Sequence, residues 1–334
     1  MRFIVTALLT ILCATLLQAS APAGAPEIRF AQQFSMGFLQ FDVLRHRDLI
    51  KKHAAALGIP DVKVTYVMFN GADVMNDALL SGAIDVASGG MPGLLTIWDK
   101  TRGTAMEARG IAPMSEIPLY LTARDPGFRS IRDFGPSDRI AMPAAKVSMQ
   151  AVLLEMAAAD VWGDADYDRL DALTVTLSPP DATAGLLSGH AGFTAAFTAP
   201  PFQEIQLRDP KVHIVLSSED VIGQSSNLVA WTTKRFHDAN PILYRALLDA
   251  MQEGAEFIAV HPREAAEYCA ADIGGNIDVD LMVELLKDTR FRYVVTPHGT
   301  MKWAEFMHRI GRLKTEPRSW KDLFWDELHD RDGS

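Results

Sequence analysis

Hydrophobic and polar positions in the first third of the chain follow two periods, one typical of strands and one typical of helices. Alternating segments predict strands, and apolar residues spaced three or four apart predict amphipathic helices. Strands are predicted at 27–31, 62–68, 85–88 and 104–109, and helices at 38–57, 72–81 and 94–100. This strand–helix–strand succession is typical of a parallel sheet with helices on its faces.

The middle of the chain repeats the same succession, and the last third is mostly helical. Strands are predicted at 117–123, 139–142, 173–177, 191–197, 212–216 and 228–232, and helices at 148–159, 181–187 and 201–207. From Pro241 onward helices are predicted at 242–260, 262–271, 279–287, 300–310 and 320–329. No low-complexity linker separates these parts, so we expect two lobes joined by strand crossings rather than by a flexible tether.

Two short stretches, 78–87 and 185–194, nearly repeat each other. Each contains two leucines, a serine and a glycine, and then small or apolar residues typical of a buried strand. Gly82 and Gly189 stand where a helix commonly ends in a left-handed residue, which glycine adopts at low cost. Chance can produce such a pair, but with the rest of the pattern it favours two similar α/β lobes with a cleft between them.

The first 25 residues have the pattern of a secretory signal peptide. Arg2 is followed by an apolar run at 3–17 and by small residues at 19–25. We expect the signal peptide to span 1–23, because Ala21 and Ala23 satisfy the small-residue rule for cleavage. An uncleaved membrane anchor is the alternative, and the shortness of the apolar run disfavours it. The mature protein is therefore expected in the periplasm.

Composition narrows the classes of partner. The chain has 334 residues, a formal net charge of −10, 22% charged residues and 48% hydrophobic residues. The negative charge disfavours nucleic acid and anionic membranes as partners, but a local site can still attract an anion. Cys269 is the one cysteine after the signal peptide, so no internal disulfide is expected.

Sequence motifs for catalysis, metals and cofactors are absent. The chain has no paired zinc cysteines, no H-E-x-x-H, no G-x-S-x-G elbow and no Walker loop. Residues 163–168 resemble the start of a calcium loop, but Arg169 and Val175 occupy the positions that need glycine and glutamate. We therefore predict no metal, no cofactor and no enzymatic activity, and interpret 163–168 as a solvated acidic turn.

Small polar residues cluster where predicted strands end, which is where open α/β sheets bind ligands. Helix N-termini at that edge attract anions through their dipoles and unpaired N–H groups, and Lys146 would add a positive charge. Ser148 could instead serve only as a helix N-cap. The predicted ligand-binding residues are Gln32, Gln33, Phe34, Ser88, Gly89, Gly90, Lys146, Ser148, Thr198, Ser226 and Asn227.

The order of several motifs resembles a known family, the periplasmic substrate-binding proteins of nitrate-, sulfonate- and taurine-type ABC importers. The resemblance rests on 31–34 after the first strand, on 79–87, 117–121, 130–134 and 139–143, and on the Asn240-Pro241 pair that opens a long helix. The chain departs from the family pattern at 133–138, where a lysine is missing, and at Gly192, where an acidic residue is common. These departures leave the ligand unidentified.

The resemblance implies a type II periplasmic binding protein fold, with two parallel-type sheets, flanking helices and a two-strand hinge. Lobe I would comprise 24–116 and 227–334, and lobe II 117–226. A monomer would capture a small ligand, with an anion favoured, and deliver it to the permease and ATPase of an ABC importer. The alternatives are an enzyme of thiamine- or menaquinone-precursor metabolism on the same fold, and a solute receptor for a sensor.

Overall fold

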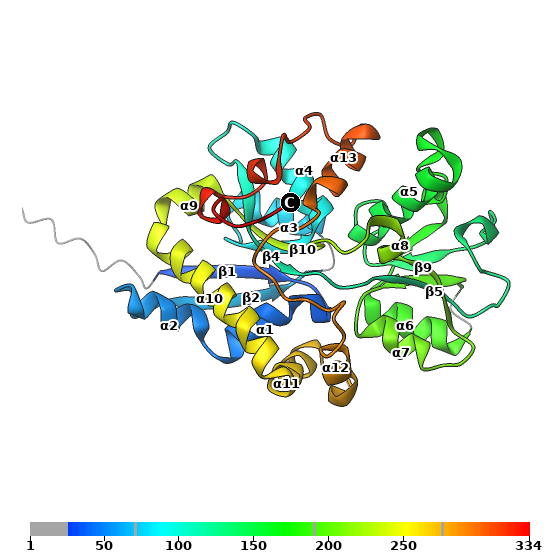
Figure 1. Cartoon of the computed structure of the whole chain (residues 1–334), viewed down its shortest axis with the longest axis horizontal. Helices are drawn as coiled ribbons and strands as arrows, with labels where there is room; N and C mark the ends of the chain where they lie inside the picture. Colours follow the sequence, from blue (N-terminus) through cyan, green and yellow to red (C-terminus); the bar gives the residue numbers. More distant parts are fainter. Residues whose placement is uncertain (1–25, 70–71, 190–191, 275–276) are drawn as a thin grey trace, which may run out of the picture.

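A computed structural model describes residues 26–69, 72–189, 192–274 and 277–334. The predicted signal peptide at 1–23 lies outside the described residues, as does part of the second repeat, at 190–191. Within the described residues, no helix has the length and hydropathy needed to cross a bilayer. Two groups of elements lie next to each other, and we call them the first and second lobe (Figure 1).

The first lobe is built on β1–β4 and β10. β1 and β2 pair in parallel, whereas β10 lies between β3 and β4 and is antiparallel to both. A parallel bridge from Phe30 to Val86 links the two sheets. The strands are β1 (Glu27–Gln32), β2 (Lys63–Met68), β3 (Ala87–Gly90), β4 (Ala108–Ser115) and β10 (Leu228–Thr233).

The second lobe contains one five-stranded sheet in the order β7-β6-β8-β5-β9. β6 is parallel to β7 and β8, and β5 is antiparallel to β8 and β9. The strands are β5 (Tyr120–Ala123), β6 (Ile140–Met142), β7 (Thr174–Thr176), β8 (Ala195–Thr198) and β9 (His213–Ser217). The predicted two-lobed α/β fold is confirmed. Each lobe mixes parallel and antiparallel strand pairs, whereas parallel sheets were predicted: β5 and β10, which directly follow the two chain crossings, are antiparallel to their neighbours. The sequence did not predict this, because hydropathy periods carry no information on strand direction.

Helices cover both lobes, and most predicted helices are present within a few residues. Those of the first lobe are α1 (Leu39–His46), α2 (Leu49–Ala56), α3 (Ala72–Ser81), α4 (Met91–Thr101), α9 (Lys234–Ala239), α10 (Pro241–Val260), α11 (Pro262–Ile273), α12 (Val279–Leu285) and α13 (Thr300–Arg309). Those of the second lobe are α5 (Met149–Trp162), α6 (Pro179–Ser188), α7 (Phe202–Leu207) and α8 (Ser218–Ile222). The short helices α8 and α9 were not predicted.

Two helix predictions were wrong. The segment 38–57 is two helices, α1 and α2, because Asp48 adopts a left-handed backbone conformation with φ of 49°. The segment 320–329 forms only the short turns Trp320–Asp322 and Asp326–Leu328. There Phe324 forms a β-bridge with Gly110 of β4. Its ring packs so closely on this glycine that a Cβ on Gly110 would lie only 2.4 Å from Cδ1 of Phe324.

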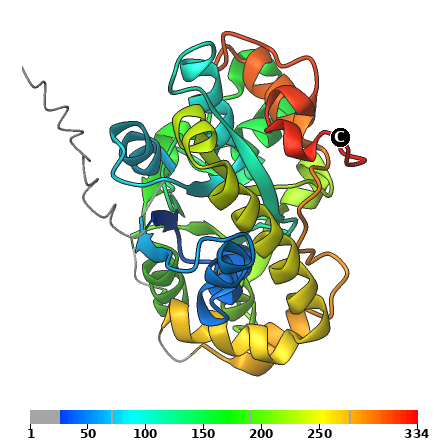
Figure 2. The ribbon, with the colours of Figure 1, turned by 90° about the vertical axis from the view of Figure 1, so that its left-hand side faces the viewer.

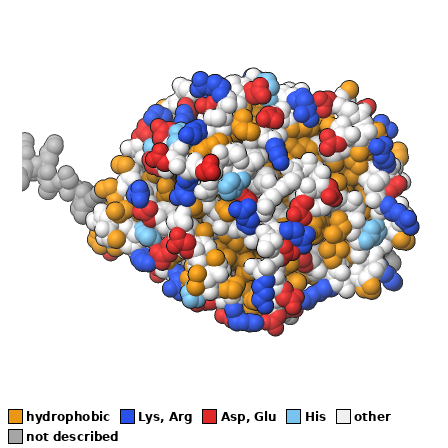
Figure 3. Space-filling view, in the orientation of Figure 1, with side chains coloured by type: hydrophobic (Ala, Val, Ile, Leu, Met, Phe, Trp, Pro, Cys, Tyr) orange, Lys and Arg blue, Asp and Glu red, His pale blue; other side chains and the backbone are white. Residues whose placement is uncertain are grey.

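Helix packing places the long C-terminal helices against the start of the chain. α10 contacts α1 and α2, and α11 contacts α1, so these helices cover one side of the first lobe (Figure 2). Gly254 permits this approach, because a Cβ there would lie 2.7 Å from Cδ1 of Leu44. Acidic and basic side chains are interspersed over the face in Figure 3, and that face shows no continuous basic patch.

Two crossings join the lobes, between β4 and β5 and between α8 and β10. Asn227 in the second crossing donates a hydrogen bond to the carbonyl oxygen of Ile117 in the first, at 2.5 Å. Ser226 donates to Oε1 of buried Glu116 at 3.1 Å, and Nδ1 of His298 lies 2.7 Å from the same oxygen. The segment around His298 therefore lies along the hinge, beside the two crossings.

Candidate functional site: an interlobe cavity

A narrow cavity lies between the two lobes, and both contribute to its walls. Its volume is about 50 Å³, which leaves room for roughly four water-sized groups, since one water needs about 10–15 Å³ by this measure. The first lobe contributes Gln33, Phe34, Ser35, Phe38, Phe69, Gly90, Gly93 and Leu228, and the second contributes Pro143, Ala144, Val147, Ser148, Met149, Gln150, Ser178, Pro179 and Ala199. No charged side chain is among them.

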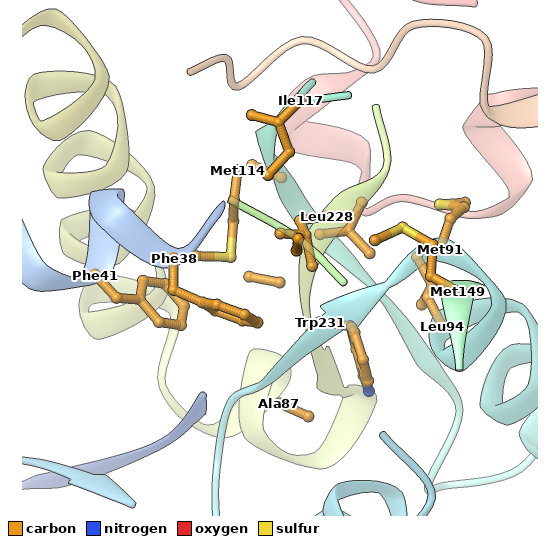
Figure 4. Close-up of a cluster of buried hydrophobic side chains, with 14 of the residues drawn as sticks. Phe38, Phe41, Ala87, Met91, Leu94, Met114, Ile117, Met149, Leu228 and Trp231 are labelled. Atoms are coloured by element: carbon orange, nitrogen blue, oxygen red, sulfur yellow. The ribbon is translucent and has the colours of Figure 1, made fainter. Parts of the chain in front are cut away.

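The lobes are in contact around this cavity. A Cβ on Gly90 would lie 2.6 Å from Cβ of Met149, so the first lobe needs a glycine at this position to approach α5. Figure 4 shows the Met149 side chain next to Met91 of α4, within one cluster of buried hydrophobic side chains. On another side, Ser35 donates to the carbonyl oxygen of Pro200 at 3.1 Å. The arrangement is therefore a closed one.

The N-terminus of α5 supplies free hydrogen-bond donors to the cavity. Ser148 is its N-cap, and its hydroxyl oxygen accepts from the N–H of Ala151 at 3.2 Å. The N–H groups of Met149 and Gln150 have no acceptor among the described residues, and both residues line the cavity. A helix of 14 residues directs a positive partial charge to this end. A hydrogen-bond acceptor or an anion is favoured there.

Two other helix N-termini border the cavity but offer fewer donors. The α6 helix begins with Pro179 and Pro180, which have no N–H. In α4, the N–H of Met91 is bonded to the carbonyl oxygen of Asn227 at 3.0 Å, and Pro92 follows. This leaves the N–H of Gly93, which has no acceptor within the described ranges. The strongest donor array is therefore that of α5.

Two glutamine side chains, one from each lobe, line the cavity as candidate ligand contacts. Gln150 is only 5% exposed, yet its amide has no hydrogen-bond partner within the part of the chain that the structure describes. The half-buried Gln33 of the first lobe likewise has no side-chain partner among those residues. Both amides are therefore available to bond to a ligand in the cavity.

Aromatic side chains form the apolar wall of the cavity on the first lobe. Phe34, Phe38 and Phe69 line it, and Phe38 is 2% exposed. Phe34 was predicted as a ligand-binding residue from its position after the first strand. Phe38, which was not among the predicted residues, packs in the hydrophobic core and also borders the cavity.

A side-chain contact joins the lobes outside the cavity. The guanidinium of Arg312, in the segment after α13, donates a hydrogen bond to the carboxyl group of Glu155 of α5, which is 1% exposed, and the contact becomes an ion pair when that carboxyl loses its proton. Its other nitrogen donates to the carbonyl oxygen of Lys146 at 2.8 Å. Burial raises the pKa of Glu155 to about 8; Arg312 opposes this shift and Asp171 adds to it. Arg309 and Asp164 form a second pair across the lobes at 2.9 Å.

Comparison with known proteins places the chain in a family. Residues 32–274, which are most of the chain, match the NMT1-like family. The chain belongs to the NMT1-like family. No protein among those with curated functions matches this NMT1-like sequence.

Solved structures share the fold of this NMT1-like chain. The periplasmic aliphatic sulphonate-binding protein SsuA of Escherichia coli has a TM-score of 0.64 at 17% identity, covering 92% of this chain and 99% of that one. The SsuA of Xanthomonas axonopodis bound to MOPS has a TM-score of 0.66 at 16% identity, covering 88% and 96%. The nitrate-binding protein NrtA of Synechocystis PCC 6803 has a TM-score of 0.67 at 13% identity, covering 87% and 83%. At these identities the likeness shows a periplasmic binding protein fold.

Four of the predicted ligand-binding residues of this NMT1-like chain lie together at the cavity: Gln33, Phe34, Gly90 and Ser148. Three others of the predicted set have structural partners instead. Gln32 is buried and donates to Asp42 at 3.4 Å. Ser88 donates to the carbonyl oxygen of Ala31, and Thr198 to Gln206 at 3.4 Å.

The remaining predicted residues also lie outside the cavity wall. Gly89 pairs with Val229 inside the sheet, and Ser226 and Asn227 form the hinge bonds described above. Lys146 is exposed, with a left-handed φ of 68°, and it lines a neighbouring cleft instead of the cavity. The predicted positive charge is therefore displaced from the cavity.

Proposed function

We propose that this protein is an extracytoplasmic solute-binding protein that captures a small ligand between its lobes. It would deliver that ligand to the permease and ATPase of an ABC importer, and would act in the periplasm as a monomer. The observation that carries the proposal is the closed interlobe cavity with unpaired donors, namely the Gln33 and Gln150 amides and the free N–H groups of α5. The signal-peptide pattern and the names of the structural neighbours support it.

The cavity limits the chemistry of the bound group. Its free donors favour a compact group with several acceptor oxygens, such as a sulfonate, nitrate, carboxylate or carboxamide. Without a cationic side chain in the wall, a group with two negative charges would lose its hydration without compensation. We therefore propose a head group that is neutral or carries one negative charge, next to an apolar part that packs on Phe34 and Phe69.

Binding without chemical turnover is part of the proposal. The cavity wall contains no His, Cys, Asp, Glu or Lys that could act as base or nucleophile. Its serines are engaged, since Ser148 caps α5 and Ser178 caps α6. The energy of binding would instead stabilise the closed arrangement of the lobes, the form that a transporter can recognise.

A thermal-shift screen of the mature protein, starting at Gly24, tests the proposal. The panel contains nitrate, alkanesulfonates, amino acids, pyrimidines and aromatic carboxylates. A ligand at about 100 times its Kd stabilises the folded state by about 2.7 kcal/mol, which raises Tm by several degrees. We expect one chemical class to give a saturable shift, with the compound recovered unchanged. No shift with any class, or conversion of the binding compound, would refute the proposal.

A matched pair of variants tests whether the cavity is the site. Gln150→Leu removes the unpartnered amide while keeping the side-chain size, and we expect it to weaken the ligand roughly ten-fold, as for one lost hydrogen bond. Gln252→Leu is the control, because Gln252 lies on α10 and bonds to Glu256 at 2.8 Å. Equal affinities in the two variants would remove Gln150 from the site.

A further inference from the structure

A second, wider cleft adjoins the interlobe cavity. Its volume is about 500 Å³, and it shares Gly93 and Val147 with the cavity wall. Gly93 belongs to α4 of the first lobe, and Val147 precedes α5 of the second. The cleft therefore lies on the same boundary between the lobes and has these two lining residues in common with the cavity.

Positive charge gathers in this cleft although the chain as a whole is acidic. Lys100, Lys146 and Arg312 line it, together with a single acidic residue, Asp77. Neither lysine ammonium has an anionic partner within ion-pair distance among the described residues. Arg312 is engaged by Glu155 and by the backbone of Lys146. The two lysines are thus the free cations of the cleft, in a chain with net charge −10.

The position of Lys146 is fixed by its backbone. Its φ of 68° is rare for a residue with a side chain. The bond from Arg312 to its carbonyl oxygen, at 2.8 Å, ties this segment of the second lobe to the first. Lys100 lies near the end of α4, on the opposite lobe. The two lysines therefore come from different lobes, and both line the cleft in the closed arrangement.

We propose that the cleft is a second subsite, which binds an anionic group carried on an arm of the ligand whose compact head occupies the cavity. This inference rests on the proposed function. The cavity, at about 50 Å³, has room for a head group and little more. Any longer part of the ligand must leave it, and the adjoining space that shares Gly93 and Val147 with the cavity is the cleft lined by the two lysines. The expected ligand is an elongated molecule with a small acceptor head and a carboxylate or similar anion at its far end.

Two matched probes test the charge of the arm. One is propanesulfonate with a terminal carboxylate, and the other is the same compound with a terminal carboxamide, so that they differ only in the charge of the arm. For partly exposed ion pairs we expect the carboxylate to bind roughly three- to ten-fold tighter, with a preference that falls as salt is raised. Isothermal titration calorimetry measures both affinities. Equal affinities for the wild-type protein would overturn the proposal.

Two double variants assign the preference to the cleft. In K100Q/K146Q the carboxylate probe and the carboxamide probe should bind with equal affinity. K211Q/K287Q removes the same charge from two exposed lysines elsewhere, Lys211 and Lys287, and should keep the preference. A preference that survives in K100Q/K146Q, or disappears equally in both variants, would refute the assignment.

Lysine acetylation followed by mass spectrometry tests the cleft without an organic ligand. Millimolar inorganic phosphate, compared with chloride at equal ionic strength, should slow acetylation of Lys100 and Lys146 more than that of Lys211 and Lys287. Equal slowing at all four lysines would overturn the subsite. If neither sulfonate probe binds but the protection is found, the sulfonate ligand of the proposed function fails while the anion subsite is supported.

Discussion

Replacing Glu155 by glutamine should change how stability depends on pH. Glu155 is 1% exposed, and burial raises its pKa from 4.5 to about 8. Between those values the folded protein holds a proton that the unfolded chain has released. Folding stability from this group is therefore greatest at acidic pH and is lost as the pH rises to about 8. An amide does not titrate in this range, so Glu155→Gln removes that loss.

The magnitude follows from the shift, which corresponds to at most about 5 kcal/mol at pH 8 and above, since one pKa unit is about 1.4 kcal/mol. Arg312 already opposes the shift, so its bond to the ionised carboxylate is included in that figure and is not subtracted again. We expect a gain of about 3 kcal/mol at pH 8.5, or roughly 5 °C in Tm for a chain of this size. Near pH 5 the variant should equal the wild type or fall slightly below it.

Thermal unfolding followed by circular dichroism between pH 5 and 9 measures this effect. Asp164→Asn is the matched control, because Asp164 is half-exposed and pairs with Arg309 across the same lobes. It should follow the pH profile of the wild type. A difference in Tm between Glu155→Gln and the wild type that stays constant, or shrinks as the pH rises, would refute the assigned cause.

Three further substitutions test packing and the hinge. Gly90→Ala places a Cβ 2.6 Å from Cβ of Met149, so we expect the lobes to stay apart and small-angle X-ray scattering to give a larger radius of gyration. Gly110→Ala places a Cβ 2.4 Å from the Phe324 ring, which should lower the free energy of unfolding in urea by about 1–3 kcal/mol. Asn227→Ala leaves the buried peptide groups of the first crossing without their partner, which should cost about 1–3 kcal/mol in thermal denaturation.

Gly135→Ala is the control for both glycine substitutions, because the nearest atom to its Cβ would be Oδ2 of Asp138, at 3.7 Å. It should leave the radius of gyration and the stability unchanged. A wild-type radius for Gly90→Ala would show that α5 can shift to accept a methyl group. Full stability of Asn227→Ala would show that water replaces its hydrogen bonds.

Local features with a direct backbone cause were predictable from sequence. Gly82 and Gly189 follow α3 and α6 with φ of 78° and 71°, as the repeated segments predicted. Ser148 is the N-cap of α5, the alternative considered for it, and it also borders the cavity. These outcomes depend on neighbouring residues alone, which is why a single sequence contains them.

Side-chain direction relative to the cleft was not predictable. Gln32 and Gln33 are adjacent at the end of β1, yet the side chain of Gln32 bonds to Asp42 and Gln33 lines the cavity. Gln150 was missed, since its place in the first turn of α5 looks like any polar helix position until the lobes close over it. Lys146 lines the neighbouring cleft, and its residue type does not predict its left-handed backbone conformation.

The central place of β10 in the sheet of the first lobe sets an order for folding during synthesis. β3 and β4 each pair with β10, and every strand of the second lobe lies earlier in the sequence than β10. The five-stranded sheet can therefore assemble on the ribosome while β3 and β4 still lack the strand that joins them. The lobe that begins the chain is therefore completed last. A chain whose synthesis stops before residue 228 lacks β10 and its buried Trp231, so the core surface that Trp231 covers would be exposed to solvent.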